Sequence, residues 1–209
     1  MKRILILLLA LSLLLVGCNG GDDVTTGNEF SQDADGYGVT DTVTGIYYRA
    51  LDFAFEPAIT SGVVGTYKNG EYTRTFYKIK GLDPALYVAD SELGVWYAGE
   101  NAPDPRALTV SAILVCEQTS FSRELFRFSA GEADAMIKEI LALWFEGESV
   151  DYPESTVQKK RTLKMSFEEL SNIFYCFDFG VFEEGAFFYD RMSGRAVAVS
   201  ADLAAELQK

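Results

Sequence analysis

The chain has 209 residues, a formal net charge of −13 and no histidine. Its length favours one domain, at about 150 residues per domain, and its apolar content of 48% excludes a disordered polymer. The acidity argues against nucleic acid as a partner, because phosphates require lysine and arginine, and the lack of histidine excludes serine–histidine and cysteine–histidine nucleophile pairs.

The N-terminal segment is typical of a secretory signal peptide. Two basic residues precede an apolar run from Ile4 to Val16, which is shorter than the roughly 20 residues of a membrane span. The run ends in Leu15-Val16-Gly17-Cys18, which resembles the lipobox of bacterial lipoproteins. The resemblance implies a signal peptide of residues 1–17, lipidation of Cys18, and a location on the extracytoplasmic side of the cell membrane or outer membrane. Removal of residues 1–17 takes away the two basic residues and lowers the net charge from −13 to −15.

Residues 18–38 are expected to form the lipidated cysteine and a flexible tether. They are rich in glycine, aspartate and other polar residues, and Phe30 is their only large apolar residue before Tyr37. Such a composition buries too little apolar surface to offset the entropy lost on ordering. Residues 39–209 are then predicted to form a single extracytoplasmic domain.

Beyond the tether, short β-like runs alternate with turn signals. Asn69-Gly70 separates the runs 62–67 and 72–80, and Asn-Gly between two such runs is the strongest short hairpin signal. A second hairpin is predicted around Ser91-Glu92. The remaining predicted strands are 46–50, 108–116, 124–128, 162–167, 174–182, 186–191 and 195–200, and residues 49–55 could alternatively form a helix.

One main amphipathic helix is predicted at about 130–145. Ser129 and Glu132 have capping-box spacing. The apolar residues with helical spacing are Ala133, Met136, Ile137, Ile140, Leu141 and Trp144. Ser200 is predicted to cap a short C-terminal helix. The pattern predicts an α+β fold in which a mainly antiparallel sheet with hairpins packs against the main helix.

Two cysteines, Cys116 and Cys176, remain besides Cys18. Both lie in apolar, strand-like runs, and two alternatives stay open. An exported compartment permits a disulfide between them, and free cysteine is also one of the most buried residue types. The chain contains no CxxC motif, so neither a redox motif nor a thiolate metal site is indicated. Since histidine, the commonest metal ligand, is also absent, we expect no metal site and no cofactor.

Four residues are candidates for a binding surface. Tyr87, Trp96 and Tyr97 lie in the second predicted hairpin, where exposed aromatic residues can stack on sugars or anchor a protein interface. The alternative is that they close the end of a small β core. Asp178 lies in the most aromatic stretch of the chain. It is either a pocket acid, a residue on an edge strand that faces water, or one paired with an arginine of the last strands.

These features predict a membrane-anchored, non-enzymatic binding or accessory module of the cell envelope. The usual serine-hydrolase, penicillin-binding and phosphate-loop motifs are absent from the sequence. The expected partners are the membrane, through the lipid, and an envelope protein or wall component. One alternative is a small wall-glycan hydrolase that uses two carboxylates, and another is a structural accessory subunit.

Overall fold

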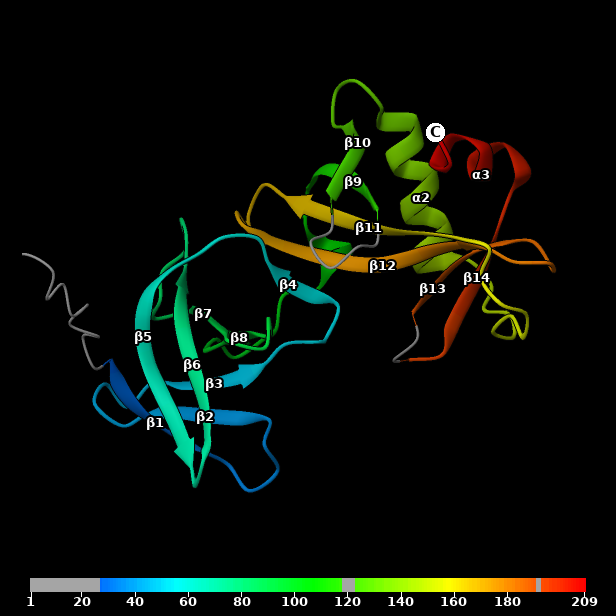
Figure 1. Ribbon diagram of the computed structural model, residues 1–209. Coiled ribbons are helices and arrows are strands. Elements are labelled where there is room, and N and C mark those ends of the chain that lie inside the picture. The colour runs from blue at the N-terminus through cyan, green and yellow to red at the C-terminus, as the bar shows by residue number, and fades with distance from the viewer. Residues whose placement is uncertain (1–26, 118–122, 191–192) are drawn as a thin grey trace, which may run out of the picture.

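The computed structural model describes residues 27–117, 123–190 and 193–209. Within these ranges the chain forms a closed barrel and an open sheet that lie side by side (Figure 1). The predicted α+β class is confirmed, but the strands form two bodies instead of one sheet packed on a helix. The predicted signal peptide and Cys18 lie outside the described residues.

The barrel is built from local hairpins. In order around the barrel, its strands are β1 (Asn28–Gln32), β2 (Gly38–Asp41), β3 (Tyr47–Ala50), β8 (Val95–Tyr97), β7 (Tyr87–Asp90), β6 (Tyr72–Ile79) and β5 (Thr60–Asn69). Both predicted hairpins are present, as β5–β6 and β7–β8. Neighbouring strands are antiparallel except β1 and β5, which run parallel and close the barrel.

Strand β1 lies in the segment expected to be a tether, so that prediction is wrong for the residues from Asn28 onward. Phe30 is only 2% exposed, and its ring stacks on Phe76 with centroids 4.5 Å apart. Gly65 makes room for it, since a Cβ at Gly65 would clash with the Phe30 ring. Backbone pairing to β2 and β5 on both sides compensates for the polar composition of the segment.

The second body is a sheet of antiparallel strands. Its order is β10 (Arg123–Ser129), β9 (Val110–Glu117), β11 (Lys159–Phe167), β12 (Ile173–Val181), β13 (Ala186–Asp190) and β14 (Arg195–Val199). The predicted strand at 108–116 is therefore confirmed as β9, which lies inside the sheet between β10 and β11.

Two helices, α2 (Asp134–Glu146) and α3 (Ala201–Leu207), pack on one face of this sheet. The predicted apolar stripe is confirmed, because Ile137, Ile140 and Trp144 are the buried residues of α2. The predicted capping box is wrong, since Ala133 is the N-cap residue and makes no side-chain cap bond. Neither of these helices has the length and apolar character that crossing a bilayer requires.

Strand β4 (Phe55–Pro57) joins the two bodies. The chain leaves the barrel after β3, and β4 then pairs antiparallel with β12 of the sheet. The Lys164 ammonium of β11 lies 2.7 Å from the Glu56 carboxylate of β4. A single hydrophobic cluster includes Ile79 from the barrel and Met165 from the sheet. The bodies are therefore joined by backbone pairing, an ion pair and a shared core.

Candidate binding site

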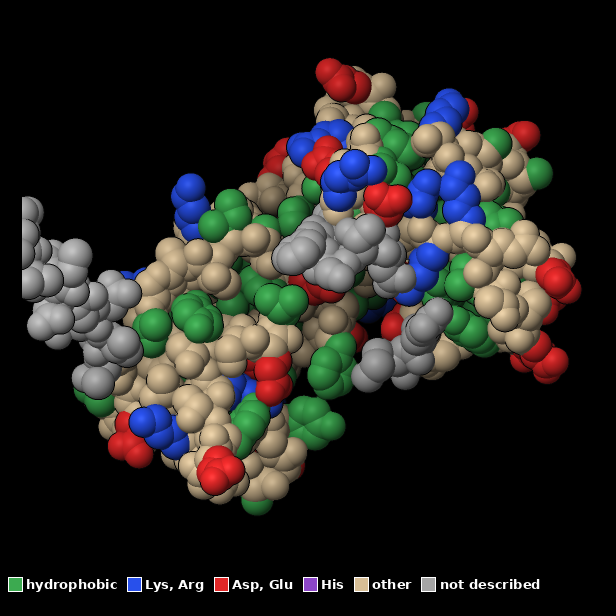
Figure 2. Space-filling model, in the orientation of Figure 1, with side chains coloured by type: hydrophobic (Ala, Val, Ile, Leu, Met, Phe, Trp, Pro, Cys, Tyr) green, Lys and Arg blue, Asp and Glu red, His purple; other side chains and the backbone are tan. Residues whose placement is uncertain are grey.

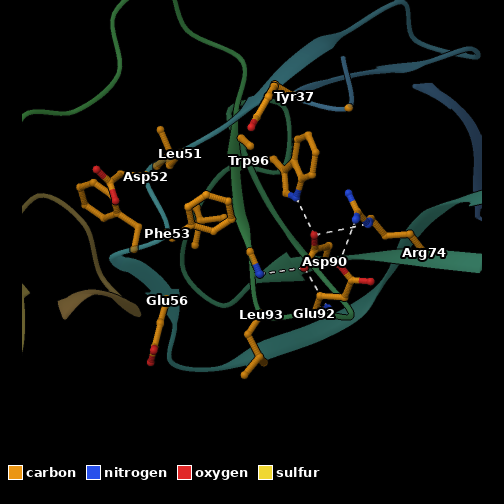
Figure 3. A pocket seen from close by; sticks show the side chains of 15 residues that line it. Tyr37, Leu51, Asp52, Phe53, Glu56, Arg74, Asp90, Glu92, Leu93 and Trp96 are labelled. Atoms are coloured by element: carbon orange, nitrogen blue, oxygen red, sulfur yellow. Dashed lines mark hydrogen bonds and ion pairs between the residues drawn. The ribbon is translucent and has the colours of Figure 1, made fainter. Parts of the chain in front are cut away.

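A pocket of about 360 Å³ opens beside the point where the chain leaves β3 for β4 (Figure 3). Its lining comes from separate parts of the barrel and from β4, which pairs with the sheet. The lining residues are Tyr37 between β1 and β2, residues 50–53 and 55–56, and Arg74 of β6. The β7–β8 hairpin adds Asp90 and residues 92–96. Exposed hydrophobic side chains are visible on the barrel and beside the narrowing where the two bodies meet (Figure 2).

Asp90 organises the floor of this pocket. It is 5% exposed, and its Oδ1 accepts the backbone N–H groups of Glu92 at 2.9 Å and Gly94 at 2.7 Å. Its Oδ2 accepts the Trp96 indole N–H at 2.9 Å. A buried carboxylate requires such compensation. Asp90 therefore fixes both the hairpin turn and the orientation of Trp96.

Arg74 lies beside Asp90 and is held in place by its neighbours. Its guanidinium donates to the Tyr72 hydroxyl and to Glu92, both at 2.9 Å, and it lies 5.5 Å from the Trp96 ring centroid. Burial alone lowers the pKa of Arg74, but the Tyr72 hydrogen bond and the charges of Glu92 and Asp90 outweigh it, so the pKa is raised. Arg74 is thus a compensated cation that supports the floor.

Three large apolar side chains stand exposed at the pocket. Tyr37 is 62% exposed, Phe53 72% and Leu93 63%, and they come from three different loops of the barrel (Figure 3). Isolated exposed apolar residues are ordinary, but residues that line a common pocket mark an interaction site.

Leu93 also has an unusual backbone conformation. Its φ is +68°, in the left-handed region that hairpins of this type normally assign to glycine. The Leu93 N–H bonds to the Asp90 carbonyl at 3.2 Å and closes the turn. The glycine is instead the next residue, Gly94, where a Cβ would lie 3.0 Å from the Asp90 carboxylate. The turn thus holds an apolar side chain in solvent at a strained position.

The pocket lining is acidic. It contains Asp52, Glu56, Asp90 and Glu92 against a single cationic side chain, Arg74. Glu56 and Glu92 are held by Lys164 and Arg74 respectively. Asp52 is exposed, and among the described residues its carboxylate accepts only the Ala54 backbone N–H, at 2.9 Å.

The three predicted aromatic residues have different positions. Trp96 is 3% exposed, so it forms a wall of the pocket instead of an open stacking surface. Tyr87 and Tyr97 pair across β7 and β8 with ring centroids 4.8 Å apart, and both are half-buried against the main core. Burial raises the pKa of Tyr87, and Tyr97 adds to the effect. The alternative that these rings close a β core therefore describes all three, because Trp96 belongs to the hydrophobic cluster of the barrel.

Asp178 is paired and lies outside this pocket. Lys160 Nζ is 2.6 Å from its Oδ2, and the Thr162 hydroxyl donates to its Oδ1 at 2.9 Å. Both partners come from the neighbouring strand β11, whereas the sequence suggested an arginine of the last strands. The position is also not an edge strand, because β12 is paired with β11 and β13.

Cys116 and Cys176 are free thiols, so the disulfide alternative is wrong. Cys116 faces Thr162 and Cys176 faces Lys164, which places the cysteines on the two strands that flank β11. Two strand spacings amount to about 9.5 Å, and a disulfide needs Cα atoms within about 7 Å. Burial raises the pKa of both thiols, and the Glu56 charge raises that of Cys176 further.

Sequence reasoning missed most of the pocket, namely Tyr37, Phe53, Arg74, Asp90 and Leu93. The available signal was Asp90 four residues before Gly94 in a predicted hairpin, a spacing that allows a carboxylate to bond the turn N–H groups. The described residues hold no group of three or more side chains suited to a metal ion.

No known protein family model matches this chain, and neither the curated proteins nor the solved structures contain a match.

Proposed function

We propose that the protein is a lipid-anchored, extracytoplasmic binding module of the cell envelope, and that its partner occupies the pocket beside β4. The observation that carries this proposal is the exposure of Tyr37, Phe53 and Leu93 around one pocket. The pocket volume of about 360 Å³ lies within the usual range for binding sites, about 300–1,000 Å³.

The hydrogen bonds and ion pairs of the pocket carboxylates support a binding function over glycan hydrolysis. A glycosidase needs one acid that carries a proton and a second carboxylate free to act on water or sugar. In this pocket Asp90 is held by the hairpin N–H groups and Trp96, Glu56 by Lys164, and Glu92 by Arg74. These contacts favour a structural role for the three acids.

The anchoring part of the proposal rests on the lipobox resemblance of Leu15-Val16-Gly17-Cys18. The Cys18→Ser variant is expected to stay unprocessed and to incorporate no labelled fatty acid in growing cells. Equal incorporation of label into the variant and the parent chain would overturn the assignment of Cys18.

The binding part can be tested by site-specific photo-cross-linking in intact cells. A photoreactive phenylalanine analogue at Phe53 is expected to form a discrete adduct. The matched control is the same analogue at Val43, which is 71% exposed but lies beyond the other end of β2 and outside the pocket lining. Identical products from the two positions, or none from position 53, would overturn the binding function. Release of wall oligosaccharides by the purified protein would favour the hydrolase.

A further inference from the structure

We infer that the pocket binds a cationic polypeptide segment. An aromatic or aliphatic side chain of that segment enters between Tyr37, Phe53 and Leu93, and a neighbouring lysine or arginine faces the carboxylates. This inference rests on the proposed binding function and specifies the class of partner.

The negative charge of the pocket lining favours a cationic ligand. Asp52 is exposed and has no ion pair within the described ranges, and the Glu92 side chain is 55% exposed although it contacts Arg74. The four carboxylates of the lining face the Arg74 guanidinium and the Lys164 ammonium that holds Glu56, so an excess of two negative charges remains, in a chain whose net charge is −13. A field of this sign attracts cationic partners and repels anionic lipids or polymers.

The shape of the site favours an extended chain over a small amine. A second pocket, of about 420 Å³, adjoins the first and shares Leu51, Asp52 and Phe55 with it. Its other walls include Trp144 and Tyr175 of the sheet body and the guanidinium groups of Arg106 and Arg195. The second pocket therefore suits an apolar side chain of the segment, and the cation faces the first pocket. Two adjoining pockets that share the lining residues of the Leu51–Phe55 segment offer positions for successive side chains of one polypeptide, as in other sites that recognise extended segments.

The apolar contacts come from residues with no structural need to be exposed. Phe53 projects from the link between β3 and β4, and Leu93 occupies its left-handed position although glycine or asparagine fits that conformation better. Such anchors, placed where a partner can exclude water from them, are typical centres of protein interfaces.

The test uses residues 19–209, which keep every described element, and three fluorescent heptapeptides in an anisotropy titration. The first peptide alternates lysine and phenylalanine, the second replaces lysine by glutamate, and the third replaces phenylalanine by serine. The first is expected to bind at least about tenfold more tightly than the others, equivalent to about 1.4 kcal/mol. Added salt is expected to weaken its binding.

Matched variants locate the binding. Leu93→Asn is expected to weaken the lysine–phenylalanine peptide about tenfold, whereas Val43→Asn leaves it unchanged. Asp52→Asn is expected to weaken it about threefold. Its control is Asp83→Asn, because Asp52 and Asp83 each accept the N–H two residues later at 2.9 Å, an interaction that asparagine preserves.

Each outcome decides the inference. Equal binding of the glutamate peptide, or binding that Leu93→Asn and Asp52→Asn leave unchanged, would overturn it. If no peptide binds while position 53 still forms its specific adduct in cells, the partner class is wrong and the binding function stands. If position 53 forms no adduct, the binding function itself fails.

Discussion

At the scale of single residues, Leu93 is expected to affect stability and binding in opposite directions. Its φ of +68° is unfavourable for a residue with a branched apolar side chain, and the side chain is mostly in solvent. Leu93→Asn is therefore expected to raise the free energy of unfolding by about 1 kcal/mol while it weakens peptide binding. Urea denaturation of the variant and the parent chain measures the first effect. A loss of stability would mean that Leu93 packs favourably in the free protein.

Asp41 provides a second prediction at this scale, which concerns acid stability. The carboxyl group is 1% exposed, and it accepts the Asn28 side-chain amide at 2.6 Å and the Val43 N–H at 2.9 Å. Burial alone raises the pKa of Asp41, but these hydrogen bonds and those from Thr44 outweigh it, so the pKa is lowered. The stabilisation that the ionised Asp41 carboxylate provides is fully present at pH values above the ordinary aspartate pKa of about 3.9. It is lost as the pH falls through the lowered value.

The Asp41→Asn variant separates this contribution from those of other carboxyl groups. It is expected to be less stable than the parent at neutral pH, and the difference is expected to shrink as the pH falls toward about 2. Urea midpoints at a series of pH values give the comparison. If the urea midpoints of the two chains change with pH in parallel, Asp41 is not the source of this pH-dependent stability.

At the scale of elements, β1 is expected to be essential to the barrel. Phe30→Ala removes a ring that is buried between Tyr48 and Phe76, and the expected loss is about 3–5 kcal/mol of unfolding free energy. Val43→Ala, at an exposed turn, is expected to cost less than about 0.5 kcal/mol. Chemical denaturation of both variants checks the contrast. A small effect at Phe30 would show that the barrel stays folded without this contact.

Helix α2 allows a similar comparison between a buried and an exposed substitution, here in the sheet body. Ile140 is fully buried and Lys138 is exposed, although both lie on the same helix. Ile140→Ala is expected to cost about 2–5 kcal/mol and Lys138→Ala less than about 0.5 kcal/mol. Thermal or urea melts give both values, and equal losses would contradict the observed helix orientation.

At the scale of the whole molecule, the barrel and the sheet are expected to unfold together. They share one hydrophobic cluster and are linked by β4, so neither body keeps its core if the other opens. The chain has two tryptophans, Trp96 in the barrel and Trp144 on α2. In the Trp144→Phe variant, Trp96 fluorescence reports on the barrel, and helical circular dichroism reports on the sheet body. Both signals are expected to show one midpoint, and separate midpoints would show that the bodies unfold independently.

The sequence was informative wherever the structural signal is local. Asn69-Gly70 and the stripe around Ile140 involve neighbouring residues, so the hairpin and α2 were predictable from one stretch of chain. Closure of the barrel pairs Asn28 with Gly65, and no local pattern encodes such a parallel contact. The pocket depends on the same long-range arrangement, because Tyr37, Phe53 and Leu93 meet only after the barrel closes. A polar segment with one phenylalanine therefore has the composition of a tether, although part of it forms β1.

The position of β1 has a mechanical consequence. Any tension applied through the chain that precedes Asn28 enters the barrel along β1, which is hydrogen-bonded on one side to β2 and on the other to β5. A pull directed along this strand loads both rows of hydrogen bonds in shear, so that they resist together instead of opening one after another. Among the described residues, β1 is therefore the strand that would carry such a load, and β4, paired with β12, is the strand that links the barrel to the sheet.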